Sequence, residues 1–131
     1  MKSQYALRSF ACLVLAAFVA GCASSPKQTE AKTSATFQAP LDKAHKAAAD
    51  ALAVIGCRIE KDEPNHLEGF RDRKVGLFVG SGGETIGVWL AAQGAGTTEV
   101  RVKTAKSFAG MAGQKNWDED VMAEIRKSLG K

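Results

Sequence analysis

A short apolar segment near the start of the chain constrains the remainder most. Ser9 to Ala20 carries no charge and one polar side chain over about 12 residues, directly after a start with two positive charges, Lys2 and Arg8. As a helix, this run would reach ~18 Å, well short of the ~30 Å hydrocarbon core of a bilayer. The pattern is typical of the apolar part of an export signal rather than of a membrane span.

The end of this segment, Val19-Ala20-Gly21-Cys22, resembles the lipobox of bacterial lipoproteins. Small residues let an extended backbone enter a peptidase, and the Cys22 sulfur is the nucleophile that would accept a diacylglyceryl group. The resemblance implies a signal peptide at residues 1–21, cleavage between Gly21 and Cys22, and lipids on Cys22 that make the membrane a partner. The alternative is an ordinary signal peptide, cut at a small-residue site, with Cys22 as a free thiol.

The residue after the cysteine indicates a destination by the same resemblance. Lipoproteins that stay in the inner membrane typically bear Asp there, whereas this chain has Ala23. In a Gram-negative cell we therefore expect the protein on the outer membrane, facing the periplasm.

Composition limits what the remaining residues can do. About 110 residues are enough for one small domain, and without Lys2 and Arg8 the net charge falls from +4 to about +2. The sequence lacks the clustered basic face that nucleic-acid binding needs. If the signal peptide is removed and Cys22 carries the lipids, Cys57 is the one cysteine left unmodified. This excludes an internal disulfide and a cysteine-based zinc site.

The domain is predicted to follow a polar linker. Residues 22–35 lack apolar periodicity, which indicates a flexible tether with a reach near ~45 Å, and residues 36–131 are expected to form a single domain. Phe37 lies in a short extended piece. Residues 41–55 carry apolar side chains at helical spacing, and Gly56 is suited to end that helix.

Alternating residues predict the strands. The segments are 57–61, 67–73, 75–79, 84–92 and 97–106. For the last two, burial of both apolar faces requires Leu90 opposite Val100 and Val88 opposite Val102, with a three-residue loop at 94–96.

A second helix completes the expected fold. Asn116 and Glu119 have the spacing of a capping box, and apolar residues then recur at helical spacing toward Leu129. The order β-α-β-β-β-β-α predicts an α+β domain, with an antiparallel sheet of four to five strands and two helices on one face. This order is similar to the helix-grip arrangement of the small lipoprotein subunit of the outer-membrane β-barrel assembly machinery. The likeness covers residues 36–130 and includes no shared motif.

Candidate chemistry is sparse, and we expect no enzyme, no metal site and no cofactor. His45 and His66 do not have the spacing of metal ligands, and a nucleophilic pair of Cys57 with His45 conflicts with the core-facing position expected for Cys57. The glycines of residues 80–83 suit a tight turn, or an exposed loop that contacts a partner, better than a phosphate loop.

Trp89 is the side chain most suggestive of binding. The predicted register places it opposite Arg101 on the sheet face away from Val88, and Lys103 and Phe78 are expected to share that face. An exposed tryptophan beside arginine is a common binding feature, although tryptophan also serves simply to cover a sheet.

Two functions therefore stay open. The first is a non-enzymatic envelope module that binds a protein or the cell wall, which a solid core with an exposed Trp89 would favour. The second is a periplasmic binder of a small apolar or lipid ligand between helices and sheet, which an apolar pocket there would favour.

The lipobox predicts the behaviour of one variant. Cys22→Ser removes the only sulfur that could accept the diacylglyceryl group, so labelled fatty acid should no longer enter the protein and the uncut precursor should accumulate. Gel analysis of the wild type and of Cys22→Ser checks the processing and the labelling. Membrane fractionation should recover the wild type in the outer membrane. Normal processing of Cys22→Ser would contradict the lipoprotein prediction.

Overall fold

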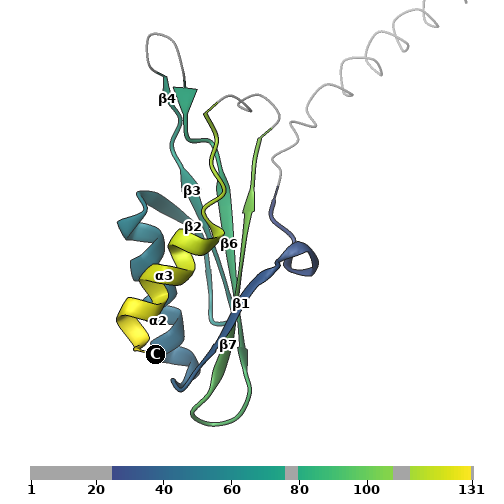
Figure 1. Cartoon of the computed structure of the whole chain (residues 1–131), viewed down its shortest axis with the longest axis vertical. Helices are drawn as coiled ribbons and strands as arrows, with labels where there is room; N and C mark the ends of the chain where they lie inside the picture. Colours follow the sequence, from purple (N-terminus) through teal and green to yellow (C-terminus); the bar gives the residue numbers. More distant parts are fainter. Residues whose placement is uncertain (1–24, 76–79, 108–112, 131) are drawn as a thin grey trace, which may run out of the picture.

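The structure is a computed structural model that describes residues 25–75, 80–107 and 113–130 (Figure 1). The signal peptide, Gly21, Cys22 and Phe78 lie outside these residues, so the predictions for them stay predictions. The elements are η1 (Gln28–Glu30), β1 (Thr33–Phe37), α2 (Leu41–Val54), β2 (Cys57–Glu63), β3 (His66–Arg71), β4 (Lys74–Val75), β5 (Gly80–Ser81), β6 (Thr85–Ala92), β7 (Thr98–Ala105) and α3 (Asp118–Leu129).

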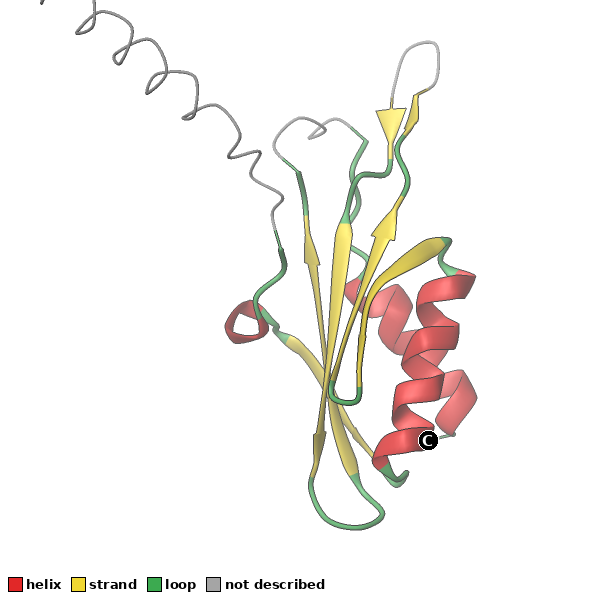
Figure 2. Cartoon of the chain, turned by 180° about the vertical axis from the view of Figure 1, so that it is seen from behind, coloured by secondary structure: helices red, strands yellow, loops and turns green. Residues whose placement is uncertain are grey.

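A five-stranded antiparallel sheet in the order β1-β7-β6-β3-β2 forms the centre of the described domain. Both helices cover one face of it, and η1 lies on the other side (Figure 2). We call the face away from the helices the outer face. The predicted α+β class, with two helices on one face of an antiparallel sheet, is confirmed.

The β6–β7 hairpin has the predicted register. Val88 pairs with Val102 and Leu90 with Val100, and all four side chains are 0–4% exposed. The Gln93 N–H donates to the Thr97 carbonyl over 2.8 Å, which closes the three-residue loop. Burial of one face therefore set this pairing, as expected.

Helix α2 lies close to the sheet because its buried face is made mostly of alanine. That face comprises Ala44, Ala47, Ala48, Ala51 and Leu52. Gly69 on β3 makes the close approach possible, since a Cβ there would lie 3.2 Å from Leu52 Cδ2 and 2.8 Å from Cys57 Cβ. Gly56 follows the helix with φ +86°, in the left-handed region that suits the predicted stop.

The start of α3 differs from the predicted capping box. The helix begins at Asp118 with Trp117 at the N-cap position, so the predicted N-cap Asn116 lies one residue too early, although its Oδ1 accepts the Asp118 N–H over 2.8 Å. Glu119 is therefore not at the third helical position, and its Oε1 accepts a 2.8 Å hydrogen bond from the Thr33 hydroxyl instead. Asp118 is buried and accepts from the backbone N–H and the hydroxyl of Thr104, which ties α3 to β7.

Most boundaries shift by one or two residues, and two segments differ more from the prediction. β1 begins at Thr33 and η1 precedes it, so ordered structure extends into the segment expected to be a flexible tether. A strand was predicted at residues 75–79, of which the structure describes only Val75. Lys74–Val75 pairs with Gly80–Ser81 in a separate two-stranded ribbon, outside the main sheet.

Gly82, which follows this ribbon, predicts a sharp substitution effect. Its φ is +93°, and an added Cβ would lie 2.2 Å from the Asp72 carbonyl oxygen, a backbone atom that cannot turn aside. Gly82→Ala should therefore lower the free energy of unfolding by more than about 1 kcal/mol. The control is Gly96→Ala in the β6–β7 loop, where nothing lies within 4 Å of the added carbon. Urea melts of both variants check this, and equal effects would contradict the clash.

Candidate functional site

Trp89 has the predicted partner but not the predicted exposure. It pairs with Arg101 and lies on the outer face, yet it is buried, with only 9% of the residue exposed. The His66 ring stacks on it, with centroids 4.9 Å apart and planes 13° from parallel. Gly87 leaves room for the indole, because a Cβ there would lie 2.5 Å from Trp89 Cη2 and 2.8 Å from Pro26 Cγ. The expectation of an exposed tryptophan is therefore wrong.

The cations predicted beside Trp89 are on the outer face, but Arg101 is engaged there. Its Nε donates to Glu99 Oε1 over 3.0 Å, with the side chain 42% exposed. Lys103 is half-buried and pairs across the strands with Gly87. The fourth residue of the predicted face, Phe78, lies outside the described residues.

His66 is a partly buried ring within this face. Burial, and after it the positive charge of Lys61, lowers its pKa, against the opposing effect of Glu68 and Glu63. The ring is consequently neutral at pH 7, and its Nε2 lies 3.2 Å from Glu68 Oε1. A neutral imidazole stacked on indole covers the tryptophan and does not carry a charge for a ligand.

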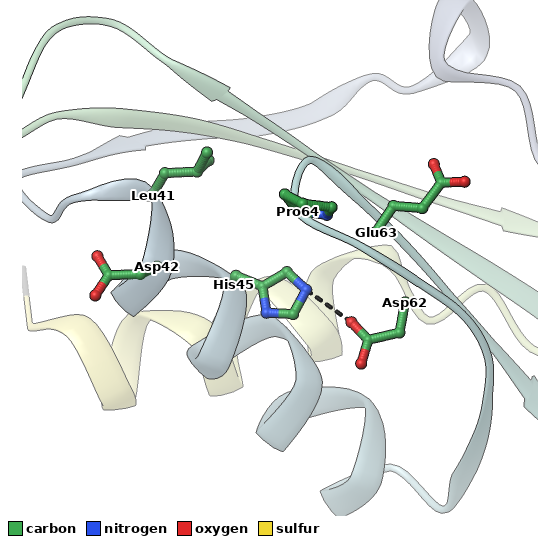
Figure 3. Close-up of a pocket in the computed structure, with 6 residues that line it drawn as sticks. All are labelled: Leu41, Asp42, His45, Asp62, Glu63 and Pro64. Carbon is green, nitrogen blue, oxygen red and sulfur yellow. Dashed lines mark ion pairs between the residues drawn. The ribbon is translucent and has the colours of Figure 1, made fainter.

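A pocket lies on the other side of the sheet, between the first turns of α2 and the turn that joins β2 to β3 (Figure 3). Its volume is about 610 Å³. We call it the His45 pocket; it is lined by Leu41, Asp42, His45, Asp62, Glu63 and Pro64. Leu41 and Pro64 supply an apolar surface, and three acidic residues border it. The Asp62 carboxylate points toward His45, whereas those of Asp42 and Glu63 point away, and Glu63 lies 3.5 Å from Lys61 Nζ (Figure 3). The pocket therefore suits a group that combines apolar surface with positive charge.

The contact between His45 and Asp62 organises this pocket. His45 Nε2 lies 2.8 Å from Asp62 Oδ1, without the alignment of a hydrogen bond, and the two side chains are 25% and 62% exposed. The pair joins α2 to the end of β2 (Figure 3). The contact is an ion pair only when the imidazole is protonated.

Sequence reasoning missed this pair because of a β-bulge. Ile59 pairs with Gly69, but the next pairs are Lys61 with Glu68 and Asp62 with Leu67, so the register shifts between Ile59 and Lys61. The extra residue turns Asp62 toward the helix side of the sheet. Simple alternation would have put Lys61 on that side, and this lysine at an expected apolar position was the available signal.

A second unpredicted cluster surrounds Glu84, which is fully buried. Its Oε2 lies 3.4 Å from Arg71 Nη1, while its Oε1 accepts from the Lys115 backbone N–H over 3.1 Å and from Trp117 Nε1 over 3.4 Å. The Arg71 guanidinium also lies 4.1 Å from the centre of the Trp117 ring. These contacts bind the start of α3 to the sheet, and the carboxylate is enclosed by its partners rather than open to a substrate.

A nucleophilic pair of Cys57 with His45, which the sequence already disfavoured, is not supported by the local chemistry. Cys57 is half-buried against the core, and burial raises the pKa of its thiol to about 11. His45 meanwhile contacts Asp62. A reactive cysteine needs the opposite shift, toward the thiolate.

Comparisons with known proteins give no family. No protein-family model matches the chain, and no curated protein matches it significantly. Within residues 25–75, 80–107 and 113–130, no group of three or more His, Cys, Asp or Glu side chains is placed to hold a metal ion. No helix in these residues is both long and apolar enough to cross a membrane.

The burial of Trp89 predicts a large effect of its removal. Trp89→Ala empties the space between His66 and Pro26, so the free energy of unfolding should fall by about 3 kcal/mol or more. Val54→Ala is the control, because Val54 is 68% exposed and its truncation should change stability by less than about 0.5 kcal/mol. Urea denaturation measures both. A loss below about 1 kcal/mol for Trp89→Ala would show that the ring is not buried in solution.

Proposed function

We propose that this chain is the precursor of a bacterial lipoprotein. The observation that carries the proposal is the order of the basic start, the apolar run and Val19-Ala20-Gly21-Cys22. After cleavage before Cys22, the lipids on that cysteine hold the protein on a membrane. Ala23, in place of an aspartate, directs it to the outer membrane with its domain in the periplasm.

The domain acts in this proposal as a non-enzymatic module that binds another envelope protein or the cell wall. The His45 pocket supports a specific binding site, since it is hollow and bears carboxylates beside apolar surface. Trp89 does not support a binding site on the outer face, because His66 and Pro26 cover its ring. The favoured partner is therefore an envelope protein that inserts a basic side chain into the His45 pocket.

The second candidate function is the binding of a small lipid-like ligand. The apolar surface of Leu41 and Pro64 favours it, because a pocket of about 610 Å³ lies within the ordinary range for small-molecule sites. The surrounding carboxylates would select an amphiphile with a positive head group over a neutral or anionic one.

The His45 pocket predicts a charge-dependent capture in intact cells. A photo-crosslinking residue at exposed position 42 should trap a partner, and adding Asp62→Lys should abolish this, because a positive charge then repels the basic group. Asp50→Lys is the control, because it makes the same charge change at an exposed aspartate of α2 that pairs with Lys46 and does not line this pocket. Gel shifts and mass spectrometry of the crosslinked product provide the readout.

Three outcomes separate the possibilities. A trapped protein that is lost in Asp62→Lys and retained in Asp50→Lys supports the protein-binding module. A trapped lipid, together with binding of dodecylammonium to the purified protein, supports the second function. Equal trapping in all three backgrounds would exclude the His45 pocket as the binding site.

A further inference from the structure

The chain before β1 is packed onto the outer face of the sheet. Pro26 is buried, and its ring meets the indole of Trp89 directly above Gly87, since both approach within 2.8 Å of the point where a Gly87 Cβ would lie. An alanine at position 87 would occupy that point. The glycine, the tryptophan and the proline therefore form one contact, in the first half of β6 (Thr85–Ala92).

The residues between Pro26 and the sheet are held by hydrogen bonds and by strand pairing. The Glu30 and Ala31 N–H groups donate to the carbonyls of Lys27 and Gln28, each over 3.0 Å, which closes the turn of η1. From Thr33 the chain is an edge strand paired with β7, and the Thr33 hydroxyl donates to Glu119 on α3. The segment that the sequence predicted to be a free tether is therefore bound to the domain from Pro26 onward.

This packing shortens the distance over which a lipid anchor can act. Cys22 is four residues before Pro26, which allows a maximum reach of ~14 Å. β6 is the central strand of five, so the nearest sheet edge is two strands away, or ~10 Å. Passing the edge and then a helix of ~10 Å diameter would need ~20 Å, about one and a half times the length available. The anchor cannot reach round to the helix side.

We infer that the outer face of the sheet lies against the membrane that holds the lipids of Cys22, while α2, α3 and the His45 pocket face away from it. The inference rests on the proposed lipidation of Cys22. It identifies the occupant of the outer face as the headgroup surface of that membrane, and it leaves the pocket open to the periplasm.

The side chains of the outer face suit polar headgroups. Arg101 is paired with Glu99, His66 lies beside Glu68, and Lys103 adds a further positive charge. Both signs are present, so the face neither inserts into hydrocarbon nor depends strongly on anionic lipid. The short anchor, rather than surface charge, holds the domain in this orientation.

Energy transfer in vesicles tests the orientation. The full lipidated protein is reconstituted in phosphatidylethanolamine–phosphatidylglycerol vesicles that carry an acceptor dye on the headgroups. A donor is attached at Ser34→Cys on the outer face or at Ser128→Cys on α3, both exposed positions with small side chains. The label at 34 should lie about 20 Å nearer the membrane than the label at 128. Protein without an added cysteine corrects for Cys57, which reacts slowly at pH 7 because its pKa is about 11.

A longer tether is the matched control. Insertion of twelve Gly/Ser residues between Ser24 and Ser25 leaves Ala23 next to Cys22 and raises the reach to ~55 Å, so the difference between the two labels should collapse. Equal distances in the native-length protein, with lipid on Cys22 shown by mass spectrometry, overturn the orientation but not the lipoprotein. Cys22 without lipid overturns both. A difference that survives the insertion overturns the role of the short anchor.

Discussion

The pairing of β6 with β7 is the constraint on which the other parts of the domain depend. Val88 and Leu90 face Val102 and Val100 on one side, and a shift of one residue would expose all of them. The same pairing fixes the opposite side, where Trp89 and Gly87 alternate with the apolar residues. Once the helices bury one face, the outer face needs a cover of its own, and the chain before β1 supplies it.

The cover works because a glycine precedes the tryptophan by two positions. Gly87 leaves a depression on the outer face, and the indole folds over it instead of projecting into solvent. His66 on β3 stacks against one side of the indole, and Pro26 completes the enclosure. A large aromatic surface is thus removed from water without a second layer of helices, and the same contact would shorten the proposed lipid anchor.

Periodicity and turn chemistry predicted much of this fold, since each depends on residues close in sequence. The alanine-rich spacing of α2, the stop at Gly56 and the β6–β7 register were all correct. The predictions that were wrong or missing concern features that depend on residues distant in the sequence. Trp89 was placed on the correct face, but its burial depends on His66 and Pro26, more than twenty and sixty residues away in the chain. The His45–Asp62 pair depends on a bulge that alternation alone does not reveal.

The two sides of the sheet have different roles in the proposed lipoprotein. The bulge in β2 turns Asp62 toward α2 and so builds the His45 pocket on the helix side, while Pro26 holds the chain before β1 on the outer side. Glu84, with Arg71 and Trp117, binds the start of α3 to the sheet and so joins the helix layer to it. If the proposed lipids are attached to Cys22, a partner that reached the His45 pocket would meet the side of the domain that faces away from the membrane.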